Sequence, residues 1–78
     1  MNSKMYNYMI LFCYNGKEYH YTFSNVANLN SKSDYSLLRG FAEEVARGWL
    51  QANNLMVDGG KLTSIRLYSV EECIYEEK

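Results

Sequence analysis

The sequence predicts a small α+β domain in which one long amphipathic helix covers one face of a three- to four-stranded, mainly antiparallel sheet. Three observations predict this class. An Asn-Gly pair separates two runs rich in aromatic residues, apolar residues recur at helical spacing in the middle of the chain, and a strand-like alternation follows near the end. The expected order is β-β-α-β or β-β-α-β-β, in a single domain over residues 1–78.

Asn15-Gly16 is the strongest hairpin signal, because a type I′ turn requires positive φ at both central positions. With this pair at the centre of the turn, bulky side chains share one face of the ribbon. That face carries the pairs Phe12–Tyr19, Ile10–Tyr21 and Tyr8–Phe23. The opposite face carries Cys13–Glu18, Leu11–His20 and Met9–Thr22. A slip of one residue would divide the bulky set between the two faces, so the register is strongly specified.

A helix is predicted from Asp34 or Ser33, either of which can cap its N-terminus, to a stop at Asn53-Asn54. The predicted apolar stripe consists of Leu38, Phe41, Val45, Trp49 and Ala52, with Ala42 and Ala46 between them. Gly40 and Gly48 are unfavourable inside a helix. We attribute both glycines to a close approach between the helix and the sheet.

The last third of the chain predicts further strands around a turn at Asp58-Gly59-Gly60. Before this turn, Leu55–Val57 forms either a short strand or part of a loop. After it, a longer strand is expected over Lys61–Val70, in which apolar and polar residues alternate. Cys73–Tyr75 either extends the longer strand or pairs elsewhere. The glutamates around it form an expected acidic C-terminal tail at about residues 71–78.

Composition argues against several functions. A net charge of −1, from 8 basic and 9 acidic residues, is atypical of a dedicated nucleic-acid binder. Cys13 and Cys73 lie far apart in the sequence and His20 is the single histidine, so we expect no metal site, no cofactor and free, buried thiols. A Cys13/His20 dyad would be offset by one residue pair, and we therefore expect a non-enzyme.

No membrane association is expected either. The apolar run Met9–Tyr14 is too short to cross a bilayer and lacks the cleavage site of a signal peptide. We therefore expect a cytoplasmic protein.

The sheet face opposite the helix is the candidate binding surface. It would present an apolar strip bordered by polar residues, and such strips mark contacts with a partner or with a second copy. Together with the acidic tail, the expected partner-binding residues are Met9, Leu11, Glu18, His20, Tyr68, Glu71, Glu72, Glu76 and Glu77.

Three stretches in this order resemble the small phage-encoded anti-CRISPR proteins that inhibit Cas9. They are Asn15-Gly16-Lys17-Glu18-Tyr19, Phe41…Gly48-Trp49 and Ser64-Ile65-Arg66-Leu67. The resemblance spans about 50 of the 78 residues. It implies a Cas nuclease or another host defence protein as the partner, met by acidic side chains where the nuclease grips DNA. The net charge of −1 departs from that pattern, and only the glutamate tail concentrates acidic groups.

These observations lead to three functional hypotheses. The first is a non-catalytic protein-binding module, encoded by a phage or mobile element, that inhibits a host defence nuclease by surface occlusion in the host cytoplasm. The second is a homodimeric structural or regulatory protein, joined through strands or through the Met9/Leu11/Tyr68 face. The third is a single-stranded nucleic-acid binder that uses tyrosine stacking.

Overall fold

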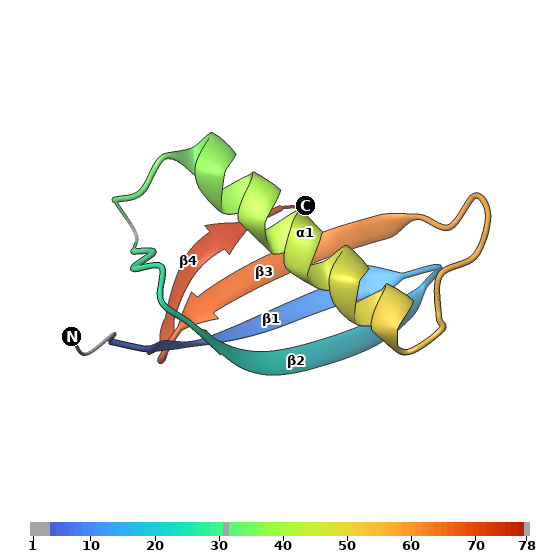
Figure 1. Cartoon of the computed structure of the whole chain (residues 1–78). Helices are drawn as coiled ribbons and strands as arrows, with labels where there is room; N and C mark the ends of the chain where they lie inside the picture. The colour runs from blue at the N-terminus through green and yellow to red at the C-terminus, as the bar shows by residue number, and fades with distance from the viewer. Residues whose placement is uncertain (1–3, 31, 78) are drawn as a thin grey trace.

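The computed structural model describes residues 4–30 and 32–77; residues 1–3, 31 and 78, the last of them part of the expected acidic tail, lie outside the described residues. Over the described ranges the elements are β1 (Tyr6–Tyr14), β2 (Lys17–Asn25), α1 (Tyr35–Ala52), β3 (Leu62–Ser69) and β4 (Glu72–Glu76). All neighbouring strands are antiparallel, in the order β2-β1-β3-β4, and α1 crosses one face of the sheet (Figure 1). The α+β class is confirmed, in its β-β-α-β-β form.

The β1–β2 hairpin has the predicted turn and register. Asn15 and Gly16 both have positive φ, 52° and 80°. Phe12 pairs with Tyr19 and Tyr8 pairs with Phe23. Asn15 also ties the turn to the segment before β3, because its N–H donates to the Lys61 carbonyl and its side-chain oxygen accepts from the Lys61 N–H, both at 3.0 Å.

Both predicted ends of the helix are confirmed. The Asp34 carboxylate accepts hydrogen bonds from the N–H groups of Ser36 (2.7 Å) and Leu37 (3.4 Å), which α1 itself leaves without partners. At the other end Asn53 is the C-cap, and Asn54 takes the left-handed conformation (φ 57°) that commonly ends helices.

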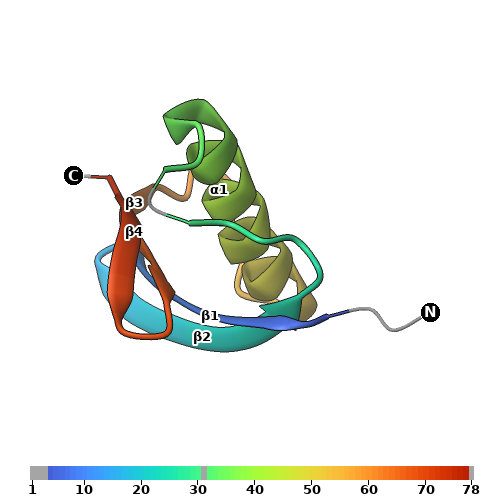
Figure 2. The same cartoon turned by 90° about the vertical axis from the view of Figure 1, so that its left-hand side faces the viewer.

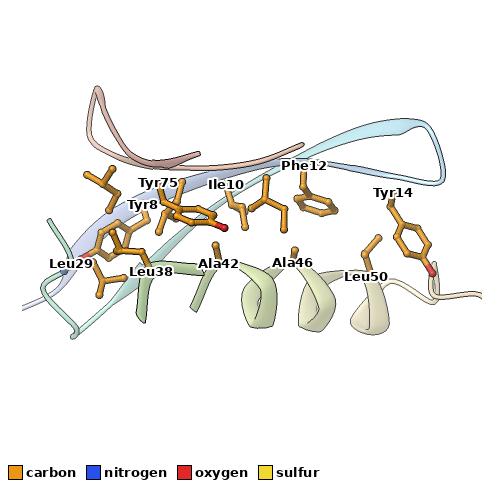
Figure 3. Packing of buried hydrophobic residues seen from close by; sticks show 13 residues of the cluster. Tyr8, Ile10, Phe12, Tyr14, Leu29, Leu38, Ala42, Ala46, Leu50 and Tyr75 are labelled. Atoms are coloured by element: carbon orange, nitrogen blue, oxygen red, sulfur yellow. The ribbon is translucent and has the colours of Figure 1, made fainter. Parts of the chain in front are cut away.

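The core lies between α1 and the inward residues of β1 and β3. Figure 3 shows four helix residues at i, i+4 spacing pointing at β1: Leu38, Ala42, Ala46 and Leu50. Ile10 and Leu67 are fully buried against this row. The predicted stripe is therefore rotated: Leu50 is buried although it was not predicted, and Ala52 is exposed although it was.

The explanation offered for the helical glycines is wrong. Gly40 and Gly48 are both exposed, and a Cβ added to either would meet no atom within 4 Å. The small residues at the contact with the sheet are Ala42 and Ala46. The methyl side chains of these two alanines, and not the absent side chains of the glycines, therefore determine how closely α1 approaches the sheet.

Two buried tyrosines hold the long loops to the ends of β1. The Tyr8 hydroxyl donates to the Ala27 carbonyl (2.5 Å) and accepts from the Leu29 N–H (2.8 Å). At the other end, the Tyr14 hydroxyl donates to the Val57 carbonyl (3.1 Å) and accepts from the Val57 N–H (2.9 Å). Each phenol thus satisfies two main-chain groups that no strand pairs.

In the last third of the chain, one point that the sequence left open is decided and one expectation is wrong. Leu55–Val57 is not a strand, because the Tyr14 hydroxyl binds the main chain of Val57. The acidic segment is not a free tail, because Glu72–Glu76 forms β4 and pairs with β3. The turn between β3 and β4 contains Val70 at φ 57°, a conformation that β-branched residues rarely adopt.

We expect the substitution Gly48→Ala to raise the free energy of unfolding by about 0.5–1 kcal/mol, because alanine loses less backbone entropy on folding and finds open space here. Urea denaturation followed by circular dichroism measures the change. A matched substitution, Ala46→Gly, should lower the stability. A destabilised Gly48→Ala variant would restore the close-approach explanation.

We expect Tyr14→Phe to lower the free energy of unfolding by about 1–3 kcal/mol, because it leaves the Val57 N–H without a partner and the Val57 carbonyl with the Gly60 N–H alone. The same denaturation assay applies. Tyr21→Phe is the matched control, since that ring lies at the exposed border of the core. Equal effects of the two substitutions would show that the Tyr14 hydroxyl does not hold the loop.

Candidate functional site

The sheet face opposite α1, here called the uncovered face, carries the strip that the sequence predicts. Figure 2 shows α1 on one side of the sheet only. On the other side, Leu11 lies between its cross-strand partners His20 and Arg66, and Met9 lies between Thr22 and Tyr68. The β1 and β3 residues of this strip are half-buried, whereas the β2 residues are exposed. The structure therefore brings five predicted site residues together: Met9, Leu11, Glu18, His20 and Tyr68.

An open hollow of about 600 Å³ occupies one end of the uncovered face. It is lined by residues of all four strands and by Glu77, which follows β4: Leu11, Phe12, Cys13, Glu18, Tyr19, His20, Ser64, Arg66, Glu76 and Glu77. Glu18 stands on the β2 side and Glu76 on the β4 side, with Leu11 and Cys13 between them. Arg66 is the cross-strand partner of Glu76. Carboxylates therefore border an apolar floor from two sides, with one guanidinium among them.

A β-bulge lies beside this hollow. The β1–β3 register shifts between Leu11 and Cys13, and Ser64 on the opposite strand has φ 53°. A left-handed non-glycine residue costs about 1–2 kcal/mol. Bulges increase the local twist and redirect side chains, and they are frequent near functional sites. Ser64 was not predicted as a site residue, because a serine inside an alternating strand gives no sequence signal for a bulge.

A second hollow, of about 370 Å³, continues the uncovered face toward the β3–β4 turn. Met9, Thr22 and Val70 contribute to its lining. Val70 is 80% exposed, so its isopropyl group stands in solvent at the rim. Together the two hollows extend the apolar strip from Cys13 to Val70, a residue that the sequence analysis did not include.

The four predicted glutamates do not form one acidic patch. Glu71 lies in the β3–β4 turn and Glu72 begins β4, whereas Glu76 ends β4 and Glu77 follows it. Because a strand separates the two pairs, only Glu76 and Glu77 line the larger hollow. The acidity that the sequence places in a tail is divided between the two ends of an edge strand.

A tyrosine pair closes the β4 side of the core beneath Glu77. Tyr75 is 3% exposed and its hydroxyl donates to the Glu77 carboxylate at 2.9 Å. The ring of Tyr35, from the first turn of α1, lies 5.0 Å from that of Tyr75. Burial raises the pKa of Tyr75 well above its usual value near 10, and the hydrogen bond to Glu77 raises it further. The neutral phenol thus fixes the position of the Glu77 carboxylate beside the core.

The Cys13/His20 arrangement is offset as the register predicts. Cys13 faces Glu18 and His20 faces Leu11, although both line the same hollow. Cys13 and Cys73 are free thiols, but the expectation that they are buried is wrong, because Cys13 is half-buried and Cys73, on the edge strand β4, is exposed. Among residues 4–30 and 32–77, no three His, Cys, Asp or Glu side chains lie close enough together to hold a metal ion. Within the same ranges, no helix has the length and apolar character that crossing a membrane requires.

We expect the stability of the protein to fall as the pH rises above about 10, partly because of Tyr75. Its pKa is higher in the folded than in the unfolded state, so the unfolded chain loses this proton first and unfolding becomes more favourable. Urea denaturation between pH 8 and about 11.5 should show a shallower fall for Tyr75→Phe than for the wild type. If the free energies of unfolding of the two proteins fell in parallel with pH, folding would not raise the pKa of Tyr75. Tyr21→Phe, which removes a more exposed phenol, is the control.

The chain matches no protein-family model, and no curated protein or solved structure shows significant similarity to it. The resemblance to anti-CRISPR inhibitors therefore stays a prediction. Any functional assignment rests on the geometry of the uncovered face.

Proposed function

We propose that the chain is a small protein-binding module that docks its partner on the uncovered face and acts by occlusion, without catalysis. The observation that supports this most directly is the larger hollow, where the apolar side chains of Leu11 and Cys13 lie between carboxylates from β2 and β4. A surface that combines an apolar strip with charged borders is typical of protein interfaces.

The chemistry of the hollow favours a basic partner surface. Glu18 and Glu76, one at each border, outnumber the one arginine in its lining, Arg66. A lysine or arginine side chain matches such a site, because its methylene stem packs on apolar groups while its charged head reaches carboxylates. The phosphates of a single-stranded nucleic acid would instead meet like charges, so a protein partner is the better fit.

The finer proposal is that this partner is a nuclease of a host defence system. DNA-binding nucleases expose lysine and arginine where they hold phosphates, and an acidic protein surface can occupy that position. The resemblance to anti-CRISPR proteins makes Cas9 the first nuclease to test. On this proposal the chain is encoded by a phage or mobile element and works in the host cytoplasm.

Cleavage of a plasmid by Cas9 and its guide RNA tests the finer proposal. We expect the wild-type chain to slow cleavage, and the double variant Glu18→Lys/Glu76→Lys to lose about tenfold or more in potency, because it repels basic side chains at both borders of the hollow. The matched control, Glu43→Lys/Glu44→Lys, makes the same change of charge on α1 and should retain potency. Unchanged cleavage with the wild-type chain would show that Cas9 is not the partner.

The docking face can be tested without a nuclease. In an NMR titration with an arginine-rich nonapeptide, we expect amide shifts to concentrate around Leu11, Cys13 and Arg66, and to weaken as salt is added. The Glu18→Lys/Glu76→Lys variant should show at most weak shifts there. Shifts on α1 alone, or none at any salt concentration, would contradict the proposed docking face.

A further inference from the structure

The two edges of the sheet differ in how well they are protected. A strand edge presents unpaired main-chain groups, and proteins usually protect it by shortness or by charge. The β4 edge has both protections, since it is five residues long and begins and ends with glutamate. The β2 edge is nine residues long, and its charged side chains, Lys17 and Glu18, both lie at the hairpin end. From residue 19 to residue 25 the edge carries no formal charge with His20 neutral.

The hairpin determines which main-chain groups of β2 point outward. In a two-residue turn the flanking residues, Tyr14 and Lys17, form a hydrogen-bonded pair, and such pairs alternate along an antiparallel ribbon. The odd-numbered residues of β2 therefore use their N–H and carbonyl groups on β1. The even-numbered residues direct theirs away from the sheet: Glu18, His20, Thr22 and Ser24.

An aromatic row follows the same edge on the helix side. Tyr19, Tyr21 and Phe23 alternate along β2, with Tyr21 stacked on Phe23 at 5.5 Å. Helix residues reach this row from one side, with Trp49 at 5.4 Å from Tyr19 and Phe41 at 5.9 Å from Phe23 between ring centroids. Because α1 packs mainly over β1, β3 and β4, the row is only half-covered, and Tyr21 is 36% exposed.

Within the described residues, the chain that leaves β2 does not cover this edge. After Asn25 it turns toward the core, where the Tyr8 hydroxyl binds Ala27 and Leu29 (Figure 1). The outward main-chain groups of β2 and the outer side of its aromatic row are therefore both accessible.

We propose that a second copy of this chain pairs its β2 with this β2, antiparallel and centred on Tyr21. In that register His20 forms hydrogen-bonded pairs with Thr22 of the second copy, and Glu18 does so with Ser24 of the second copy. The strand is suited to this because its pattern from residue 18 to residue 24 is symmetric about Tyr21, aromatic at odd positions and polar at even ones. The two sheets become one, with both helices on the same side.

The side chains favour a second copy over an unrelated strand. Tyr21 meets its own counterpart and Tyr19 meets Phe23 of the second copy, both as non-hydrogen-bonded pairs, in which side chains come closest. Lys17 faces Asn25 of the second copy and Glu18 faces Ser24 of the second copy, so the pairing places no like charges opposite each other. The contact is isologous and leaves β4 as the outer edge at both ends, where its glutamates oppose further pairing. This assembly is independent of the partner proposed for the uncovered face.

Sedimentation equilibrium tests the assembly. Protein concentrations from about 1 to 500 µM cover the dissociation constants of both tight and weak dimers. We expect a wild-type dimer. Thr22→Pro should raise its dissociation constant by about 100-fold or more, because proline lacks the outward N–H yet is tolerated on an edge strand. The matched control, Thr22→Ala, keeps the N–H and should remain a dimer. Circular dichroism checks that each variant is folded.

Cysteine cross-linking tests the register independently of the proline variant. In a Cys13→Ser/Cys73→Ser background, Tyr21→Cys should form a disulfide between copies under mild oxidation, since the two positions oppose each other at a separation that disulfides accept. His20→Cys should not, because it faces Thr22 of the second copy. A wild-type monomer throughout the range, a dimer that survives Thr22→Pro, growth beyond a dimer, or cross-linking by His20→Cys alone would each overturn the proposal.

Discussion

The packing of α1 onto β1 is the contact on which the rest of the structure depends. Four helix residues at i, i+4 spacing lie against the inward side chains of β1, and the two central ones, Ala42 and Ala46, are the smallest (Figure 3). They let the helix lie low enough for Leu38 and Leu50 to fill the two ends of the core. A domain of this size has few other apolar contacts to replace this one. The tyrosine hydroxyls at the ends of β1 then attach the loops to a strand that the helix already holds.

The same packing separates the surfaces of the molecule. Because α1 covers the sheet from one side, the opposite face keeps its apolar strip and its two hollows. Because the helix lies mainly over β1, β3 and β4, the aromatic row on β2 is left half-covered. The face and the edge share Glu18, His20 and Thr22, but the face uses their side chains and the edge uses their main-chain groups, so a partner and a second copy can bind together. A dimer would then present two docking faces on the same side, which increases apparent affinity for a repeated target.

The parts of the fold that could be predicted are those with local chemical signals. Asn15-Gly16 accepts positive φ readily, and the turn it forms sets the whole register of the hairpin. Asp34 at the start of α1 and Asn54 at its end act through contacts a few residues away. The uncovered strip followed directly from the hairpin register, since residues of one parity share a face.

The parts of the fold that could not be predicted depend on contacts between residues distant in the sequence, or on backbone conformations that the residue type does not indicate. Val70 and Ser64 both take left-handed conformations that usually signal glycine or asparagine, so the β3–β4 turn and the bulge carried no signal. Val57 looks like part of a strand, but its main chain is bound by Tyr14, which lies 43 positions earlier. The division of the acidic segment by β4 followed from the missed turn.

The order of the elements has a consequence for the chain during its synthesis. Both strands of the hairpin emerge from the ribosome before α1, the element that buries Ile10 and Phe12. During that interval the hairpin exposes its future core side chains to solvent, and an isolated hairpin is at best marginally stable. The time for which this exposed hairpin can contact another nascent chain therefore depends on how fast residues 35–52 are translated and α1 forms. A chaperone at the exit tunnel of the ribosome would limit those contacts.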